Sequence, residues 1–249
     1  MSREYNEETK IMRKRIYTVN ENFFEKIDNS IKSNVLGFIF ADGYNAEYKN
    51  QLVINLWDID KYYLEGIKFL MQSEHPITFR KRQKQHHHDS FCIGICSAKI
   101  CKDLKKMGCY QNKSLTVKFP SNEFVPTNYQ RDFVRGYFEG DGSVSLNKST
   151  NSYNFTISST QNMCEGIANV IKNELGIKIY IRERKWKHSP NINYEIGIGG
   201  NKKIYKILNW LYKDAPFVMF RKYKIYLELK EKYSGQNLEE SLEEKSIST

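Results

Sequence analysis

The sequence predicts an α+β protein made of two similar halves, each with the order helix, hairpin, helix, hairpin, helix. A nine-residue motif occurs twice, at residues 35–43 and 134–142, and the two copies align without a gap. Similar patterns of apolar and polar residues follow each copy, first with the period of strands and then with that of helices. A segment that contains Pro120 and Pro126 separates the two regions. These features together predict an internal repeat.

The expected elements follow the same order in both halves. In the first half, the motif helix precedes a hairpin with a strand over 52–57, a helix over 61–71, strands over 77–82 and 92–95, and a last helix. In the second half, the corresponding elements are strands over 143–146 and 153–158, a helix over 163–175, strands over 179–184 and 195–198, and a last helix. Aligning 77–82 with 179–184 places the arginines of each strand on one face. The expected divisions are a partly helical lead-in (1–30), a first half (31–111), a linker (112–130), a second half (131–233) and an acidic, mobile tail (234–249).

The chain is strongly basic. It has 39 Lys and Arg against 29 Asp and Glu, a net charge of +10, and because the tail carries −3 the first 233 residues carry +13. Seventeen Tyr, fourteen Phe and three Trp accompany this charge. A basic chain rich in aromatic residues favours a polyanion partner, usually nucleic acid, whereas a generic basic enzyme is the alternative.

Other classes of protein are disfavoured. The longest apolar run, residues 35–41, has seven residues, and a membrane-spanning helix needs about 20. The N-terminus lacks the apolar core of a signal peptide. Five cysteines, without the density of a disulfide scaffold, are typical of reduced thiols. We therefore expect an intracellular protein, cytoplasmic or organellar, with no membrane partner.

The two motifs predict apolar helices interrupted by small residues. Residues four apart lie on one helix face, so Gly37 with Ala41, and Gly136 with Gly140, form stripes where another backbone can approach closely. A glycine inside a helix costs roughly 1 kcal/mol relative to alanine, and close helix packing would offset that cost. We expect the two helices to pack on each other about a pseudo-twofold axis.

Asp42 and Asp141 stand at the C-terminal ends of these helices, and each precedes a glycine, Gly43 or Gly142, suited to a left-handed cap. A carboxylate is electrostatically misplaced there, because a helix C-terminus already carries partial negative charge. Two carboxylates and the free helix-end carbonyls would form an oxygen-rich site for a hard divalent cation such as Mg²⁺. The alternative is that each Asp-Gly pair only makes a turn after a buried helix.

The motif pair resembles the two copies of the LAGLIDADG motif in monomeric homing endonucleases, over roughly residues 20–233. The resemblance implies an αββαββα fold in each half, with a four-stranded antiparallel, saddle-shaped sheet that sits on double-stranded DNA. It implies that the eighth motif residues, Asp42 and Asp141, bind Mg²⁺ or Mn²⁺ with help from the carbonyls of Ala41 and Gly140. Two half-sites that act on two strands would give a double-strand break.

The same resemblance implies that a lysine near the end of each half assists catalysis, and the matching positions are Lys113 and Lys222. Such a lysine could polarise water or neutralise charge in the transition state; the alternative is a solvated or phosphate-contacting side chain. The sequence departs from the family pattern at the sixth motif residue, often acidic, which is Phe40 in the first copy and Glu139 in the second.

The arginine-bearing strands predict a DNA-contacting surface. A two-stranded ribbon fits the major groove, where Arg and Lys pair with guanine and Gln or Asn with adenine. Some residues would touch only phosphate, and a solvated sheet face would show the same alternation. The expected DNA-contacting residues are Lys49, Gln51, Arg80, Arg82, Gln83, Lys84, Gln85, Lys148, Asn151, Arg182, Arg184, Lys185, Lys187 and His188.

A zinc site near the three consecutive histidines at 86–88 is the weaker metal hypothesis. The cysteines that follow, at 92, 96, 101 and 109, form no CxxC pair. We expect Cys92 and Cys96 to fill one face of a strand as small hydrophobic residues instead.

The leading hypothesis is a sequence-specific, metal-dependent DNA endonuclease that acts as a monomer. The alternatives on the same scaffold are an RNA maturase that helps a host intron to fold, and a DNA-binding regulator that does not cut. A nucleotide-handling enzyme lacks support because neither GxxxxGK[ST] nor GxGxxG occurs. The sequence shows no intein splice-junction context, which favours a free-standing or intron-encoded protein.

Overall fold

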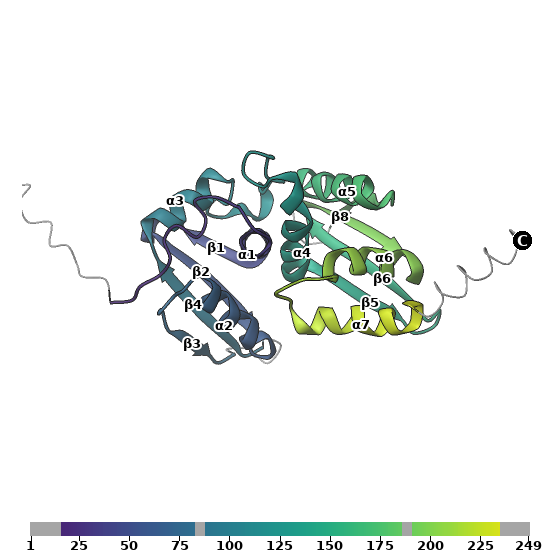
Figure 1. The fold of residues 1–249 in the computed structure, drawn as a ribbon, viewed down its shortest axis with the longest axis horizontal. Helices are drawn as coiled ribbons and strands as arrows, with labels where there is room; N and C mark the ends of the chain where they lie inside the picture. The colour runs from purple at the N-terminus through teal and green to yellow at the C-terminus, as the bar shows by residue number, and fades with distance from the viewer. Residues whose placement is uncertain (1–15, 83–87, 186–190, 235–249) are drawn as a thin grey trace, which may run out of the picture.

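The computed structural model describes residues 16–82, 88–185 and 191–234. Two halves lie side by side, with the motif helices α1 (Ser30–Asp42) and α4 (Gln130–Asp141) at their junction (Figure 1). Each half has the order αββαββα and one four-stranded sheet. The predicted α+β class and the duplicated arrangement are confirmed.

The first half continues after α1 with two hairpins and two helices. These elements are β1 (Gly43–Ala46), β2 (Gln51–Trp57), α2 (Lys61–Leu70), β3 (Ile77–Arg80), β4 (Ser90–Cys96) and α3 (Ala98–Lys106). The strands form an antiparallel sheet in the order β1-β2-β4-β3. Short 3₁₀ turns join some elements, among them η1 (Glu47–Lys49) and η2 (Asp58–Asp60).

The second half repeats this order after α4 and then adds a helix. Its elements are β5 (Gly142–Asn147), β6 (Ser152–Ser159), α5 (Gln161–Leu175), β7 (Tyr180–Lys185), β8 (Ile192–Gly199), α6 (Asn201–Tyr212) and α7 (Phe220–Ser234). The sheet order β5-β6-β8-β7 matches that of the first half. The α7 helix, which lies beside α6 in Figure 1, is an addition that the repeat did not predict.

The two motif helices meet where both carry glycine. A Cβ atom on Gly37 would overlap the carbonyl of Phe133, and a Cβ on Gly136 would overlap the carbonyl of Asn34. The two contacts are equivalent under the pseudo-twofold symmetry, because residue 34 aligns with 133 and residue 37 with 136. The predicted pseudo-twofold packing through the motif helices is confirmed.

Each sheet packs one face on helices and exposes the other. On β2, Leu52, Ile54 and Leu56 are buried, whereas Asn55 and Trp57 between and after them are exposed. This alternation is expected of a strand with one face on the core. We call the exposed face of each sheet its outer face.

The first strands of the two second hairpins, β3 and β7, correspond with a shift of two residues from the predicted alignment of 77–82 with 179–184. Ile77 pairs with Ile93 in the first sheet, and Ile181 pairs with Ile196 in the second. Because Ile93 and Ile196 hold equivalent places in their sheets, Ile77 corresponds to Ile181 and not to Ile179. A shift of two residues leaves every side chain on its original face, so the predicted arginine face survives this error.

The remaining segments frame the two halves. Two 3₁₀ turns, η3 (Lys113–Leu115) and η4 (Thr127–Tyr129), lie in the segment expected to be the linker. The acidic residues of the expected tail lie outside the described residues, which end at 234. In the part of the chain that the structure describes, no helix has the length and apolar character needed to cross a membrane.

Candidate functional site

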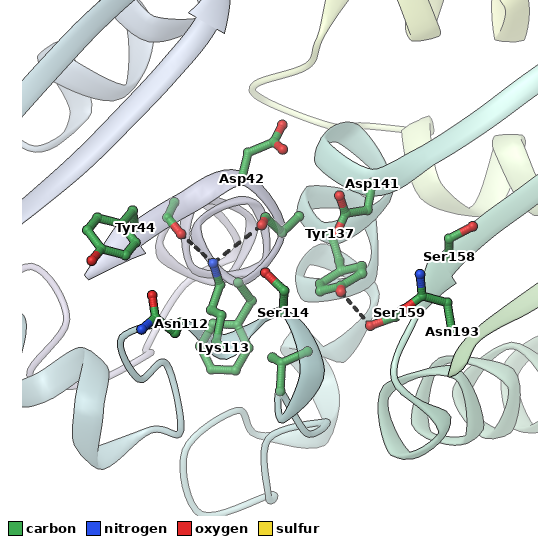
Figure 2. Close-up of a pocket in the computed structure, with 14 residues that line it drawn as sticks. Asp42, Tyr44, Asn112, Lys113, Ser114, Tyr137, Asp141, Ser158, Ser159 and Asn193 are labelled. Carbon is green, nitrogen blue, oxygen red and sulfur yellow. Dashed lines mark hydrogen bonds between the residues drawn. The ribbon is translucent and has the colours of Figure 1, made fainter. Parts of the chain in front are cut away.

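The two motif aspartates come together at the adjoining ends of α1 and α4. Asp42 and Asp141 both line a cavity of about 490 Å³, which Figure 2 shows at the junction of the two halves. A Cβ on Gly140 would lie 3.3 Å from Asp42 Oδ2, so one helix end passes close to the carboxylate of the other. Tyr44 and Ser158, on the outer faces of the two sheets, also line this cavity. The aspartates therefore sit where the two outer faces meet.

Burial shifts the pKa values of both aspartates. Burial and, next, the negative charge of Asp42 raise the pKa of Asp141 to about 6. Burial also raises the pKa of Asp42, while Lys222 and Lys113 act in the opposite direction. Burial disfavours the ionisation of both carboxylates, and the charge of Asp42 further disfavours that of Asp141, so a cation would stabilise the charged pair.

Gly43 and Gly142 do not form the expected left-handed caps. Both have extended backbone, with φ −78° and ψ 149° at Gly43 and φ −85° and ψ 159° at Gly142. Glycine is required for space instead, because a Cβ would lie 2.7 Å from Ile39 Cγ2 at the first position and 2.5 Å from the Phe138 carbonyl oxygen at the second. The chain passes directly from helix to strand, with the aspartate at the joint.

Lys113 and Lys222 lie beneath the same helix ends. Lys113 is 7% exposed and Lys222 is 3% exposed, so neither is a solvated surface side chain. Lys113 Nζ donates to the carbonyl of Ala41 at 3.4 Å and to that of Gly43. Figure 2 shows this ammonium group between the end of α1 and the start of β1.

The second lysine is bound more completely. Lys222 Nζ donates to the carbonyls of Phe138 at 2.5 Å, Glu139 at 2.8 Å, Gly140 at 3.3 Å and Gly142 at 2.6 Å. Burial lowers its pKa to about 7, with Arg221 as the next cause. An ammonium group at the C-terminal end of a helix satisfies carbonyls that have no partner within the helix.

The donor set at the aspartates fits a hard divalent cation. Asp42 and Asp141 supply carboxylate oxygens, and Ala41 and Gly140 supply carbonyls whose lysine contacts are the long ones, at 3.4 and 3.3 Å. Mg²⁺ is commonly held by one or two carboxylates, with waters and substrate phosphates as further ligands. Within the described ranges, His, Cys, Asp and Glu form no group of three or more with metal-binding geometry, so a cation here would rely on this pair.

Tyr137 is a site residue that the sequence analysis missed. Its hydroxyl lies 2.6 Å from Ser159 Oγ, and its proximity to Asp141 lowers the pKa of that carboxyl. Figure 2 shows Tyr137 between the aspartate and the serine. The available signal was the fourth motif position, where the first copy has Phe38 and therefore no hydroxyl.

The sixth motif residue of the second copy serves packing. Glu139 is fully buried, and its carboxylate accepts hydrogen bonds from Asn34 at 3.0 Å, Tyr63 at 2.7 Å and the backbone N–H of Met219 at 2.8 Å. Its counterpart Phe40 is apolar and also buried. Glu139 thus ties both halves to the segment that leads into α7.

The start of α7 is attached to the first half by two further contacts. Arg221 Nε donates to Asp60 Oδ2 at 2.8 Å, and the backbone N–H of Phe220 donates to the hydroxyl of Tyr62. Asp60 lies in η2 and is 2% exposed. Residues of the first half therefore hold the helix turn that carries Lys222.

The structure distributes the expected DNA-contacting residues unevenly. Gln51, Arg80, Arg182 and Arg184 lie on outer faces, whereas Lys185 alternates to the opposite side of β7 and pairs with Glu183. Lys49, Arg82, Lys148 and Asn151 are exposed in turns or at strand ends. Gln83, Lys84, Gln85, Lys187 and His188 lie outside the described residues.

One outer-face residue was not anticipated. Glu195 on β8 lies directly across from Arg182 and forms ion pairs with Arg182 and Arg184. The pairing of Glu195 with these arginines depends on the register between β7 and β8, which the sequence pattern does not determine.

Comparisons with known proteins bear on this arrangement. Residues 128–210 match the family described as LAGLIDADG-like domain, and comparison with curated proteins gives no match. The homing endonuclease I-WcaI, solved bound to its DNA recognition sequence, is 16% identical, with a TM-score of 0.57, covering 82% of this chain and 90% of that chain.

Two further structures share the fold. The meganuclease I-SmaMI, bound to uncleavable DNA, is 14% identical with a TM-score of 0.51, covering 80% of this chain and 88% of its own. Full-length WhiA from Thermatoga maritima is 14% identical with a TM-score of 0.53, covering 92% of this chain and 72% of its own. The predicted resemblance is confirmed, and the chain is a two-motif protein of the LAGLIDADG fold whose second half matches the LAGLIDADG-like domain family.

Proposed function

We propose that this protein is a site-specific, metal-dependent DNA endonuclease. The observation that carries the proposal is the pair Asp42 and Asp141, brought to one cavity at the meeting of the two outer faces. Carboxylates at helix C-termini cost stability unless something offsets them, and a bound cation is the simplest compensation. The DNA-bound structures of I-WcaI and I-SmaMI support a DNA partner for the same fold.

The cation would be held by Asp42 and Asp141, with the carbonyls of Ala41 and Gly140 as further oxygens. Mg²⁺ or Mn²⁺ bound there would supply Lewis-acid polarisation of the scissile phosphodiester and of an attacking water. The two carboxylates would hold the cation at the junction of the two sheets. A DNA duplex lying across both outer faces would therefore bring its phosphate backbone to the cation.

The two lysines hold their amino groups in fixed positions at these helix ends. Lys113 and Lys222 are anchored by helix-end carbonyls, so their ammonium groups cannot swing away from the site. In a partly enclosed cavity they would stabilise negative charge that develops on the phosphate. With a pKa of about 7, Lys222 can also gain or lose a proton near neutral pH.

A single chain completes the arrangement. Both aspartates and both lysines come from one polypeptide, and the helix contact that joins the halves is internal. We therefore propose a monomer that cuts both strands. The net charge of +10 would make the affinity for DNA fall steeply as salt increases.

The test is cleavage and binding by Asp42→Asn and Asp141→Asn, separately and combined. The amides keep the size of the carboxylates but remove their charge, so each variant should lose cleavage in Mg²⁺ while DNA affinity stays within a few fold. A duplex library with randomised sequence provides the substrate, and the cleaved products define the site. Full cleavage by the double variant would refute the metal assignment, and no cleavage by the wild type would refute the endonuclease.

A non-cleaving nucleic-acid binder on this scaffold is the second candidate. One observation favours it: the ammonium group of Lys222 is already occupied by four carbonyls, an arrangement that would also suit a purely structural role. Sequence-selective DNA binding by the wild type without cleavage in Mg²⁺ or Mn²⁺ would support a regulator. A faster splicing rate of intron RNA in the presence of the protein would support a maturase.

A further inference from the structure

Two arginines on the outer face of the second sheet share one carboxylate. Arg182 Nε lies 3.2 Å from Glu195 Oε1, and Arg184 Nη2 lies 2.9 Å from the same oxygen. The Glu195 side chain is 11% exposed, against 58% for Arg182 and 50% for Arg184. The carboxylate is thus largely enclosed, while both guanidinium groups reach the solvent.

A groove of about 390 Å³ lies beside this trio of Arg182, Arg184 and Glu195. Gly197 is the residue next to Arg182 within it, and a Cβ there would lie 2.8 Å from Arg182 Nη2. Glycine at this position leaves room for the guanidinium group to lie close to the sheet surface. The groove and the trio therefore form one continuous surface feature on the outer face of the second sheet.

Among the described residues of the first sheet, nothing corresponds to the trio. Cys92 holds the place that Glu195 holds in the second sheet, and Thr78 lies opposite Cys92 as Arg182 lies opposite Glu195. A thiol cannot replace a carboxylate as a partner for two guanidinium groups. Any recognition that depends on the trio is consequently confined to one half of the protein.

The contacts with Glu195 determine which donors remain for a ligand. Arg182 faces Glu195 through Nε in an ion pair, and in the described part of the chain its two terminal nitrogens have no hydrogen-bond partner. Two terminal donors match the O6 and N7 acceptors of guanine in the major groove. Arg184 already uses one terminal nitrogen, so it suits a single contact with a base or phosphate.

We infer that Glu195 is a specificity-determining residue of the second half, because it positions Arg182 to contact a guanine in the half-site beneath the second sheet. Holding the arginine in advance reduces the conformational entropy lost on binding, and a planar guanidinium is suited to such a fixed contact. The inference rests on the proposed recognition of DNA and deepens it by assigning a base and a positioning residue.

The experiment selects binding sites from a library of randomised duplexes, without divalent cation, for wild type, Glu195→Gln and Glu183→Gln. Glu183 is the matched control, since it lies on the neighbouring strand β7, loses the same charge and alternates to the opposite side. Glu195→Gln should lower the preference for guanine about tenfold at one position of one half-site. Glu183→Gln should leave every position unchanged.

Arg182→Lys gives a second, independent reading of the same position. A lysine cannot make two parallel hydrogen bonds, so the guanine preference should fall at the position that Glu195→Gln affects. Thermal unfolding of each variant monitors the fold, and if Glu195→Gln does not fold, Glu195→Asp, which keeps the charge but shortens the side chain, replaces it in the selection.

The outcomes separate the inference from the proposed function. If the wild type selects a site and the variants keep its guanine preference, the inference is overturned while DNA recognition stands. Uniform weakening without a change in any base preference also overturns it, because that result indicates phosphate contact. If the wild type selects no sequence, the proposed function and the inference both fail.

Discussion

Gly37 lies directly against the carbonyl group of Phe133, so the two motif helices touch backbone to backbone. This contact, together with its symmetric copy at Gly136 and Asn34, sets the distance between the helix ends. The spacing of Asp42 and Asp141 therefore depends on two positions one turn or more away from them.

Replacing Gly37 or Gly136 with alanine should destabilise the protein by about 1–3 kcal/mol each, because the added methyl group would force the helices apart. Urea unfolding measures the change. Glu65→Ala, at an exposed position of α2, is the control and should change stability by no more than about 0.5 kcal/mol. An unchanged unfolding midpoint in both glycine variants would contradict the close contact.

Glu139→Ala should cost about 3 kcal/mol or more, because it leaves buried donors of Asn34, Tyr63 and Met219 without their shared acceptor. Glu139→Gln keeps one carbonyl acceptor and should lose less. Denaturant unfolding gives the ranking, and limited proteolysis near Met219 should be faster in the alanine variant. Equal stability of both variants and the wild type would show that this network does not hold α7.

The pKa of Lys222, lowered to about 7 by burial, predicts a dependence of stability on pH. Between about 7 and the unfolded value near 10.4, the unfolded chain binds the proton more readily, so this group's contribution to stability rises with pH. Lys222→Met removes the titration. The free energy of unfolding of the wild type minus that of the variant should increase from about pH 7 to pH 9. A constant difference would mean that burial does not shift this amine.

Mg²⁺ should raise the Tm of the wild type by roughly 2–4 °C for each kcal/mol of stabilisation by binding. The Tm of the double variant Asp42→Asn/Asp141→Asn should stay unchanged. Because the pKa of Asp141 is raised to about 6, protons should compete with the cation as the pH falls through that value. Differential scanning calorimetry tests both statements, with NaCl of equal ionic strength as the control. An equal rise in both proteins would place the cation elsewhere.

Local periodicity made much of the fold predictable. The two motif copies and the strands after them are recognisable from patterns within short stretches of sequence. The four-residue spacing of Gly37 and Ala41 identifies one face of a helix. That spacing also led to the meeting of Asp42 and Asp141, since packing the two stripes brings the helix ends together.

Features that depend on long-range register or on space were not predictable. The cap expected at Gly43 was wrong because the chain runs straight into a strand, where side-chain volume rather than a left-handed turn demands glycine. The role of Glu195 was not predicted because cross-strand pairing determines its partners. The predicted alignment of the β3 and β7 strands was also shifted by two residues. The burial of Lys113 and Lys222 depends on segments distant in sequence from the motif helices.

The attachment of α7 to the first half limits how far the halves can be exchanged. Arg221 and Phe220 of the second half depend on Asp60 and Tyr62 of the first. A chimera that joins the second half to the first half of another such protein would lose these partners unless they were transplanted with it. The two halves are therefore similar in architecture without being interchangeable parts.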